Sequence, residues 1–145
     1  MTAVHAHPAP PSTRARRLVG PLGTIAALSL TTLALHVRDP HQHGTWGLCP
    51  LYATTGIYCP GCGGLRAVND LTYGHVGAAL SSNILVTLLI PVVSIGLLVW
   101  AVDRWQGRTR VVPWSRLRPF VVSLVTVMLV FAVARNTGAG AWLAP

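Results

Sequence analysis

The residues best suited to chemistry are three cysteines: Cys59 and Cys62, which belong to a Cys-Pro-Gly-Cys segment, and Cys49 upstream of them. Thiolates are preferred ligands of zinc, and glycines beside a Cys-x-x-Cys pair permit the tight turn that points both sulfurs at one centre. A tetrahedral zinc site takes four ligands, and the cysteines supply three of them. The candidates for the fourth ligand are His75, His43, His41 and Asp70.

Two other interpretations use the same thiols. In a redox site, Cys62 would begin a helix with Arg66 one turn later, and both a helix N-terminus and a nearby cation lower the pKa of a thiol. A thioredoxin-like site, however, needs a βαβ scaffold, and the sequence shows no strand pattern. In a structural disulfide, Cys49 would pair with Cys59 or Cys62, which leaves one thiol over. All three alternatives remain open from the residues alone.

Several polar residues beside apolar segments are candidates for a second, polar site. An i, i+4 spacing lets Arg66 and Asp70 form an ion pair on one helix, but an arginine buried at membrane depth would instead meet an acid or a ligand anion. Asn83 is suited to cap a helix, and Arg135 ends an apolar run, where it would anchor the chain at the interface. The candidate polar site comprises Arg66, Asp70, Asn83, Arg135 and Asn136.

The composition excludes an ordinary soluble domain. Hydrophobic residues make up 52% of the chain and charged residues 10%, against about 25% charged residues in a soluble domain. The net charge of +8 comes from eleven arginines and three aspartates. Most of the arginines lie in two blocks that flank apolar segments, which is how charges that orient a membrane protein are distributed. We therefore expect contact with the lipid bilayer and no binding of nucleic acid.

Three apolar runs predict transmembrane helices at about 18–37, 84–102 and 119–135. The first run is about 30 Å long at 1.5 Å per residue, which matches the hydrocarbon core of a bilayer. Residues 1–17 are expected to form a disordered, basic cytoplasmic tail, because the first part is rich in proline and alanine and has no apolar period. Residues 18–145 would then form a single membrane domain.

An amphipathic helix is predicted at about 64–80, with a break near Gly74. Apolar side chains recur with helical spacing on one face of this segment, and polar side chains fall largely on the other. We expect this helix to lie at the membrane interface or to re-enter the membrane after the Cys-x-x-Cys loop. The apolar face holds Leu65, Val68 and Leu71, and the polar face holds Arg66, Asn69, Asp70 and Tyr73.

The arginine blocks predict the orientation of the chain. Basic residues concentrate in cytoplasmic segments, and both blocks lie on the same side of the predicted spans. The amino terminus is therefore expected in the cytoplasm, and the cysteine loop and the carboxy terminus outside it. In a bacterium, that compartment favours disulfides.

The segment Thr55-Gly56-Ile57-Tyr58-Cys59-Pro60-Gly61-Cys62-Gly63-Gly64-Leu65-Arg66-Ala67 resembles the small bacterial membrane proteins grouped as domain of unknown function 2752. Cys49 matches an upstream cysteine of that family, and Arg135-Asn136 matches its late Arg-Asn pair. Leu65 and Ile84 depart from the Thr and Pro that the family carries there. The resemblance implies a fold and a location, implies no known activity, and implies that Cys59, Cys62, Arg66 and Asn83 act as a unit.

We therefore expect an all-α membrane protein with three transmembrane helices and an interfacial or re-entrant helix. The expected role is that of a non-enzymatic accessory or assembly subunit in a bacterial cell membrane. It would dock a membrane-protein partner or a second copy through a cysteine loop that a disulfide or zinc stabilises. The alternatives are a membrane thiol–disulfide redox protein that uses Cys59 and Cys62, and a zinc-binding membrane protein.

Overall fold

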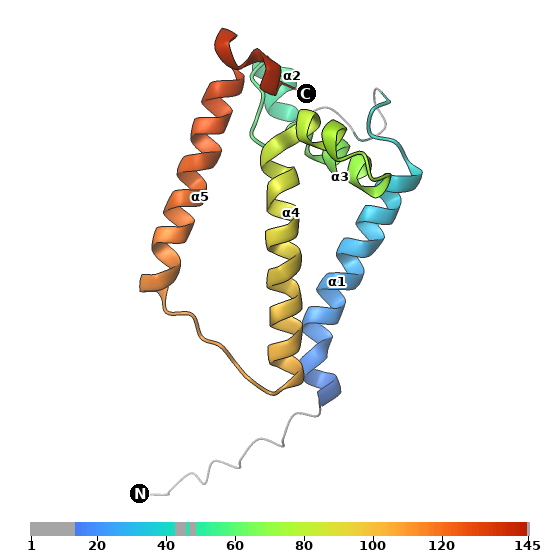
Figure 1. Ribbon diagram of the computed structural model, residues 1–145, viewed down its shortest axis with the longest axis vertical. Helices are drawn as coiled ribbons and strands as arrows, with labels where there is room; N and C mark the ends of the chain where they lie inside the picture. Colours follow the sequence, from blue (N-terminus) through green and yellow to red (C-terminus); the bar gives the residue numbers. More distant parts are fainter. Residues whose placement is uncertain (1–13, 43–45, 47–48, 145) are drawn as a thin grey trace, which may run out of the picture.

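The computed structural model describes residues 14–42, 46 and 49–144 of the chain, and the ordered elements in these residues are all helical (Figure 1). Three long helices form the body of the molecule, and the short elements gather at one end of it. The elements in chain order are α1 (Arg14–Val37), α2 (Pro50–Thr55), α3 (Gly64–Thr72), α4 (Val76–Trp105), α5 (Trp114–Arg135) and the 3₁₀ helix η1 (Gly138–Leu143).

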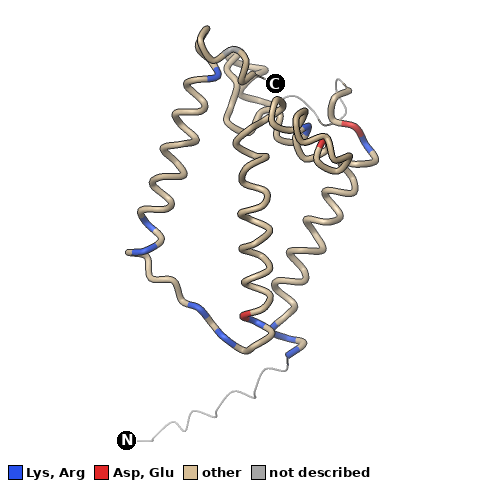
Figure 2. Tube along the Cα trace, viewed as in Figure 1, with Lys and Arg blue, Asp and Glu red and all other residues tan. Residues whose placement is uncertain are grey.

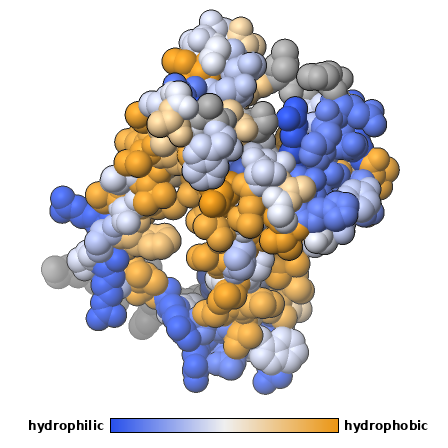
Figure 3. All heavy atoms as spheres, turned by 45° about the horizontal axis from the view of Figure 1, so that its top comes forward, coloured by the Kyte–Doolittle hydropathy of each residue, from blue (hydrophilic) through white to orange (hydrophobic). Residues whose placement is uncertain are grey.

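Within the described residues, three helices are long and apolar enough to cross a membrane: α1, α4 and α5. Their side chains are mostly exposed, and Figure 3 shows apolar residues along the body of the molecule and hydrophilic residues towards its ends. Such surfaces suit contact with lipid rather than with water, because a bilayer solvates apolar side chains. The prediction of an all-α membrane protein with three spanning helices and a short helix after the cysteine loop is confirmed.

The long helices extend beyond the predicted apolar runs. α1 begins at Arg14 rather than near residue 18, because arginine has a high helix propensity and continues the first turn. α4 begins at Val76 and α5 at Trp114, each several residues before the predicted span. The predicted disordered tail lies largely in residues 1–13, outside the described residues, and the single-domain organisation stays a prediction.

A kink at Asn83 divides α4 into a short first part and a long second part. Its backbone angles of φ −164° and ψ 101° are extended rather than helical. The side-chain Oδ1 atom accepts a hydrogen bond from the Val86 backbone N–H at 2.9 Å, so Asn83 caps the second part as the sequence predicts. Across the kink, the Thr87 hydroxyl lies within hydrogen-bond distance of the Ala79 and Asn83 carbonyls, at 2.9 and 2.8 Å.

The helix α3 directs its polar residues into the protein. Asn69 and Asp70 are buried, whereas Leu65 is 45% exposed. The Asn69 Nδ2 atom donates to the Leu35 carbonyl at 2.7 Å, which satisfies one of the carbonyls that the last turn of α1 leaves without a helical partner. A close approach of α3 to α4 depends on Gly64, because a Cβ atom there would lie 3.2 Å from a methyl group of Val86. α3 therefore joins the ends of α1 and α4.

Arginines gather at the end of the molecule where α1 begins, α4 ends and α5 begins, opposite the short helices (Figure 2). We call this group the arginine cluster; its members are Arg14, Arg16, Arg17, Arg104, Arg108, Arg110, Arg116 and Arg118. Within this group, Arg110 forms an ion pair with the buried Asp103 at 2.7 Å. The Arg14 guanidinium lies over the Trp105 ring, 5.7 Å from its centroid, and links the start of α1 to the end of α4. Basic and tryptophan side chains together are typical of a helix end at a membrane surface.

Candidate functional site

The three cysteines come together at the end of the molecule opposite the arginine cluster. Cys49 directly precedes α2, and Cys59 and Cys62 lie in the loop between α2 and α3. The Cys59 Sγ atom lies 3.1 Å from that of Cys62 and 3.5 Å from that of Cys49. All three sulfurs lie within 4.8 Å of one another, and all three residues are half-buried. These three thiols were predicted from the sequence as one candidate site, and the fold places them next to one another.

The spacing of the sulfurs is close enough for all three to bind one metal ion. A disulfide joins sulfurs about 2.0 Å apart, and the cysteines here are free thiols. A tetrahedral zinc ion with bonds of about 2.3 Å holds two sulfurs about 3.8 Å apart. Among the described residues, this group of potential ligands contains the three cysteines alone, and His75 is not part of it.

The three thiols differ in acidity because their surroundings differ. The backbone N–H of Tyr52, assisted by the Cys59 and Cys62 thiols, lowers the pKa of Cys49 to about 7. Burial, followed by the contacts with the other two thiols, raises the pKa of Cys62 to about 12. The redox interpretation of the sequence assumed a lowered pKa at Cys62, and burial reverses that shift.

These pKa values predict an order of alkylation in the metal-free protein. At pH 8 a thiol of pKa about 7 is mainly thiolate and one of pKa about 12 is almost wholly protonated, so Cys49 should react with iodoacetamide much faster than Cys62. The rate at Cys49 should rise about tenfold between pH 6 and pH 8, because the thiolate fraction rises through its pKa. Peptide mapping by mass spectrometry over time measures both rates, and equal rates at the two sites would contradict the assignment.

Asn83 holds the cysteine loop from the side of α4. It is 1% exposed, and its Nδ2 atom donates to the carbonyls of Pro60 and Cys62, each at 2.9 Å. The same side chain caps the helix through Val86. One buried amide therefore fixes the loop and the kink of α4 together, through two carbonyls within the Cys59–Cys62 turn.

Arg135 and Asn136 hold the same loop from the end of α5. The Arg135 Nη1 atom donates to the carbonyls of Cys59 and Cys62 at 3.0 and 3.1 Å. The Asn136 side chain donates to the Tyr58 carbonyl at 2.8 Å and accepts from the Tyr58 N–H at 2.9 Å. We call these two residues, with Asn83, the loop clamp. The clamp occupies backbone carbonyls of the loop and leaves the sulfur atoms available.

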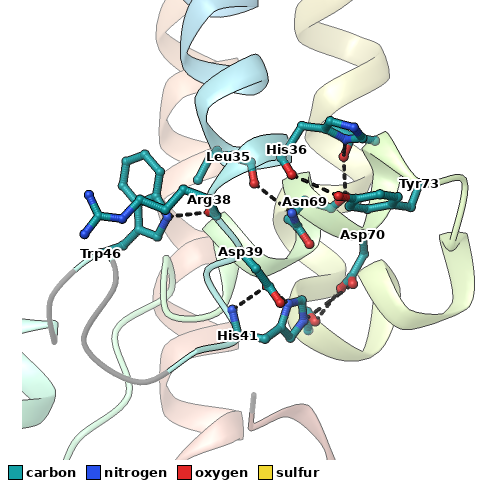
Figure 4. A network of polar contacts seen from close by, with 11 residues as sticks. Leu35, His36, Arg38, Asp39, His41, Trp46, Asn69, Asp70 and Tyr73 are labelled. Atoms are coloured by element: carbon teal, nitrogen blue, oxygen red, sulfur yellow. Dashed lines mark hydrogen bonds and ion pairs between the residues drawn. The ribbon is translucent and has the colours of Figure 1, made fainter.

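A second polar network ties the end of α1 to α3 (Figure 4). The His36 Nδ1 atom lies 2.9 Å from the Thr72 hydroxyl, and the Tyr73 hydroxyl donates to the His36 carbonyl at 2.9 Å. The rings of His36 and Tyr73 stack with centroids 4.4 Å apart. Trp46 donates to the Arg38 carbonyl at 2.7 Å. These bonds supply partners to carbonyls at and just beyond the end of α1.

His41 lies between two carboxylates in this network (Figure 4). Its Nδ1 atom is 2.8 Å from Asp39 and its Nε2 atom 3.5 Å from the buried Asp70, which also accepts from Ser82 at 2.9 Å. The backbone N–H of His41 is the main cause that lowers the pKa of Asp39. The described residues show no ion pair between Arg66 and Asp70, because Asp70 turns towards His41. The i, i+4 pair considered from the sequence is therefore not formed.

The structure divides the predicted polar residues between two places. Asn83, Arg135 and Asn136 contact the cysteine loop, whereas Arg66 and Asp70 lie on α3, where Asp70 joins the network of Figure 4. His75 directly precedes α4, and its ring stacks 6.2 Å from that of Tyr73. His43 lies outside the described residues.

Tyr58 and Ser82 were not among the predicted site residues, although both contact site residues. Tyr58 bonds Asn136 through its backbone, and its ring lies 5.6 Å from the Arg135 guanidinium. Position beside Cys59 was the signal that could have indicated Tyr58. Ser82 bonds the buried Asp70, and its place beside Asn83, at a predicted helix start, offered a similar signal.

The fold and the site together define a multi-pass membrane protein with a cluster of three cysteines at one end. Residues 49–97 match the model of a family described as "Protein of unknown function (DUF2752)". The matched segment runs from Cys49 through α3 into α4 and includes every cysteine of the cluster, which confirms the resemblance inferred from the sequence. The searches of curated proteins and of solved structures gave no match.

Proposed function

We propose that this chain is a membrane protein of the bacterial cell envelope whose cysteine cluster binds one divalent metal ion, with zinc as the preferred ion. The metal stabilises the loop between α2 and α3 as a rigid surface. Through that surface the chain serves as a small, non-enzymatic accessory or assembly subunit for a membrane-protein partner. The observation that carries the proposal is the convergence of three sulfurs within 4.8 Å of one another from two segments of the chain.

The donor set supports zinc over hard cations. Thiolates are soft ligands that select zinc, copper(I) and iron–sulfur centres, whereas magnesium and calcium take oxygen ligands. Catalytic zinc sites have three protein ligands and keep a fourth position for water, whereas structural sites take four, so a structural zinc here needs a fourth donor from outside the cysteine cluster. The loop clamp also supports the proposal, because groups that orient the residues carrying metal ligands raise metal affinity.

The charge distribution supports the orientation that we propose for this site. The arginine cluster lies at the end of the molecule opposite the cysteines, and clustered arginines favour the cytoplasmic side of a membrane. The cysteine cluster would then face the extracytoplasmic compartment. Metal binding there would protect the thiols from oxidation, because a thiolate bound to zinc is not available to form a disulfide.

A second candidate function is thiol–disulfide exchange, favoured by the closeness of the Cys59 and Cys62 thiols. In that reaction, Cys59 and Cys62 would form a disulfide and release two protons and two electrons. A partner disulfide would take up both to become two thiols. The short distance of 3.1 Å between the two sulfurs is compatible with this step.

Intact mass of the purified full chain separates these functions. We expect the native mass in detergent to exceed the denatured mass by one zinc ion, and three thiols to become alkylatable after denaturation without reductant. A disulfide protein would give no metal and two thiols blocked until reduction. That second result would overturn the metal proposal and favour thiol–disulfide exchange, provided that a mixed disulfide with a partner can be trapped in the Cys62→Ser variant.

A further inference from the structure

Helix α5 is attached to the rest of the described protein chiefly at its last turn. Arg135 is the only buried residue of α5, and the candidate span in this helix has no buried residue. The ribbon of α5 stands apart from that of α4 along much of its length (Figure 1). The closely packed neighbour of α5 is η1, which follows it in the chain. Its position relative to the other helices therefore depends on the contacts of Arg135 and Asn136 with the cysteine loop and on those of η1 with α4.

The guanidinium of Arg135 lies in an unusual environment for a buried cation. The residue is 2% exposed, and its Nε and Nη2 atoms have no hydrogen-bond partner in the described structure. Its Nη1 atom bonds two carbonyls of the loop that carries the thiols. The rings of Phe131 and Tyr58 lie 5.0 and 5.6 Å from its central carbon. A buried charge of this kind is costly unless an opposite charge lies close by.

A metal-loaded cysteine cluster would supply that opposite charge. Three thiolates around one divalent ion carry a net charge of −1, and Arg135 carries +1. The two groups share the short Cys59–Cys62 segment, because the arginine bonds the carbonyls of the residues whose sulfurs form the cluster. Metal in the cluster therefore stabilises Arg135 in its buried position, and Arg135 in that position stabilises the metal–thiolate centre.

We propose that Arg135 and Asn136 are positioning residues of the metal centre, and that metal binding and docking of the α5 end on the cysteine loop are coupled. This inference rests on the proposed metal centre and states how that centre is regulated. Coupling between two binding events is reciprocal, so the factor by which docking raises metal affinity equals the factor by which metal favours docking. Loss of metal would release the end of α5 from the loop.

Hydrogen exchange on the full chain in detergent, with and without zinc, tests the coupling. The Tyr58 amide reports docking directly, because its N–H is bonded to the Asn136 side chain. After removal of zinc by a chelator, we expect exchange at Tyr58 and at Asn136–Gly140 to accelerate by about 10 to 100-fold, the range found for outer-shell partners of metal sites. Amides within α1 should keep their exchange rates.

The Arg135→Gln substitution should lower zinc affinity by the same factor of about 10 to 100. In this variant, the Tyr58 amide should exchange fast even at high zinc concentration. Arg135→Lys retains the charge and should recover part of the zinc affinity. This recovery is not expected if Arg135 has only a structural role. Arg116→Gln removes an arginine at the opposite end of α5 and serves as the control. If Arg135→Gln fails to fold, Asn136→Ala replaces it, and the comparison of the wild-type chain with and without zinc needs no variant.

The outcomes separate the coupling from the proposed function. Zinc present by native mass, with unchanged exchange at Tyr58 on its removal, overturns the coupling and leaves the metal centre in place. A wild-type chain that binds no zinc overturns both. Zinc binding with accelerated exchange on its removal, and with unchanged behaviour of Arg116→Gln, supports both.

Discussion

Replacing Cys59 by serine is expected to weaken zinc binding by more than about a hundredfold. Cys59 is the central thiol of the cluster, since its sulfur lies 3.1 Å from Cys62 and 3.5 Å from Cys49. A serine hydroxyl stays protonated at neutral pH and does not replace a thiolate ligand. Loss of an outer-shell partner already costs about 10 to 100-fold, and loss of a direct ligand costs more.

Competition with a chromophoric zinc chelator, in the same detergent, measures this change. Thr54→Ala is the matched control, because its hydroxyl bonds only carbonyls of Pro50 and Leu51 within the adjacent α2. The control should bind zinc as the wild type does. Equal affinity of Cys59→Ser and wild type would remove the cysteine cluster from the account of metal binding, whatever the fate of the other two thiols.

Replacing Asn83 by alanine is expected to destabilise the protein by about 2 to 4 kcal/mol. The side chain makes three hydrogen bonds at a position that is 1% exposed: two to the loop and one to the N–H of Val86. Each bond contributes about 1 kcal/mol, and buried groups left without partners add a further cost. Alanine adopts the extended backbone of this position without strain, so the effect reports the side chain alone.

Equilibrium unfolding in mixed micelles measures this loss. Ser81→Ala is the matched control two residues away, because its exposed hydroxyl bonds only the Ala78 carbonyl within the same turn. We expect less than about 0.5 kcal/mol for the control. Asn83→Asp keeps the acceptor that caps the helix but places a carboxylate oxygen against the carbonyls of Pro60 and Cys62, so it should destabilise the protein at least as much as Asn83→Ala. A change below about 1 kcal/mol for Asn83→Ala would show that the loop does not depend on this amide.

The sequence predicted the features that depend on local pattern. A bilayer requires long apolar helices, so each spanning helix could be recognised from an uninterrupted apolar run. The cap at Asn83 followed from its place before such a run. The cysteines could be proposed as one cluster because few residue types bind soft metals, although their convergence is a property of the fold.

The contacts between residues that are distant in the sequence could not be predicted from local patterns. Arg135 has the same sequence context whether it anchors a helix end at the lipid surface or turns inward to bond the Cys59 carbonyl. Asp70 has Arg66 one turn away on its own helix, yet it pairs with His41 from the segment after α1. In both cases the choice of partner depends on how the helices pack, which a periodic pattern does not encode.

The separation of 76 residues between Arg135 and Cys59 also constrains the order of assembly. Contacts that close long loops form late, since their entropic cost is met only after nearer segments have associated. Transmembrane helices insert individually before they associate. The pairing of α1, α3 and α4 would therefore precede the arrival of α5, and closure of the clamp would complete maturation. A clamp variant would then accumulate as a fully inserted, immature chain that remains sensitive to protease.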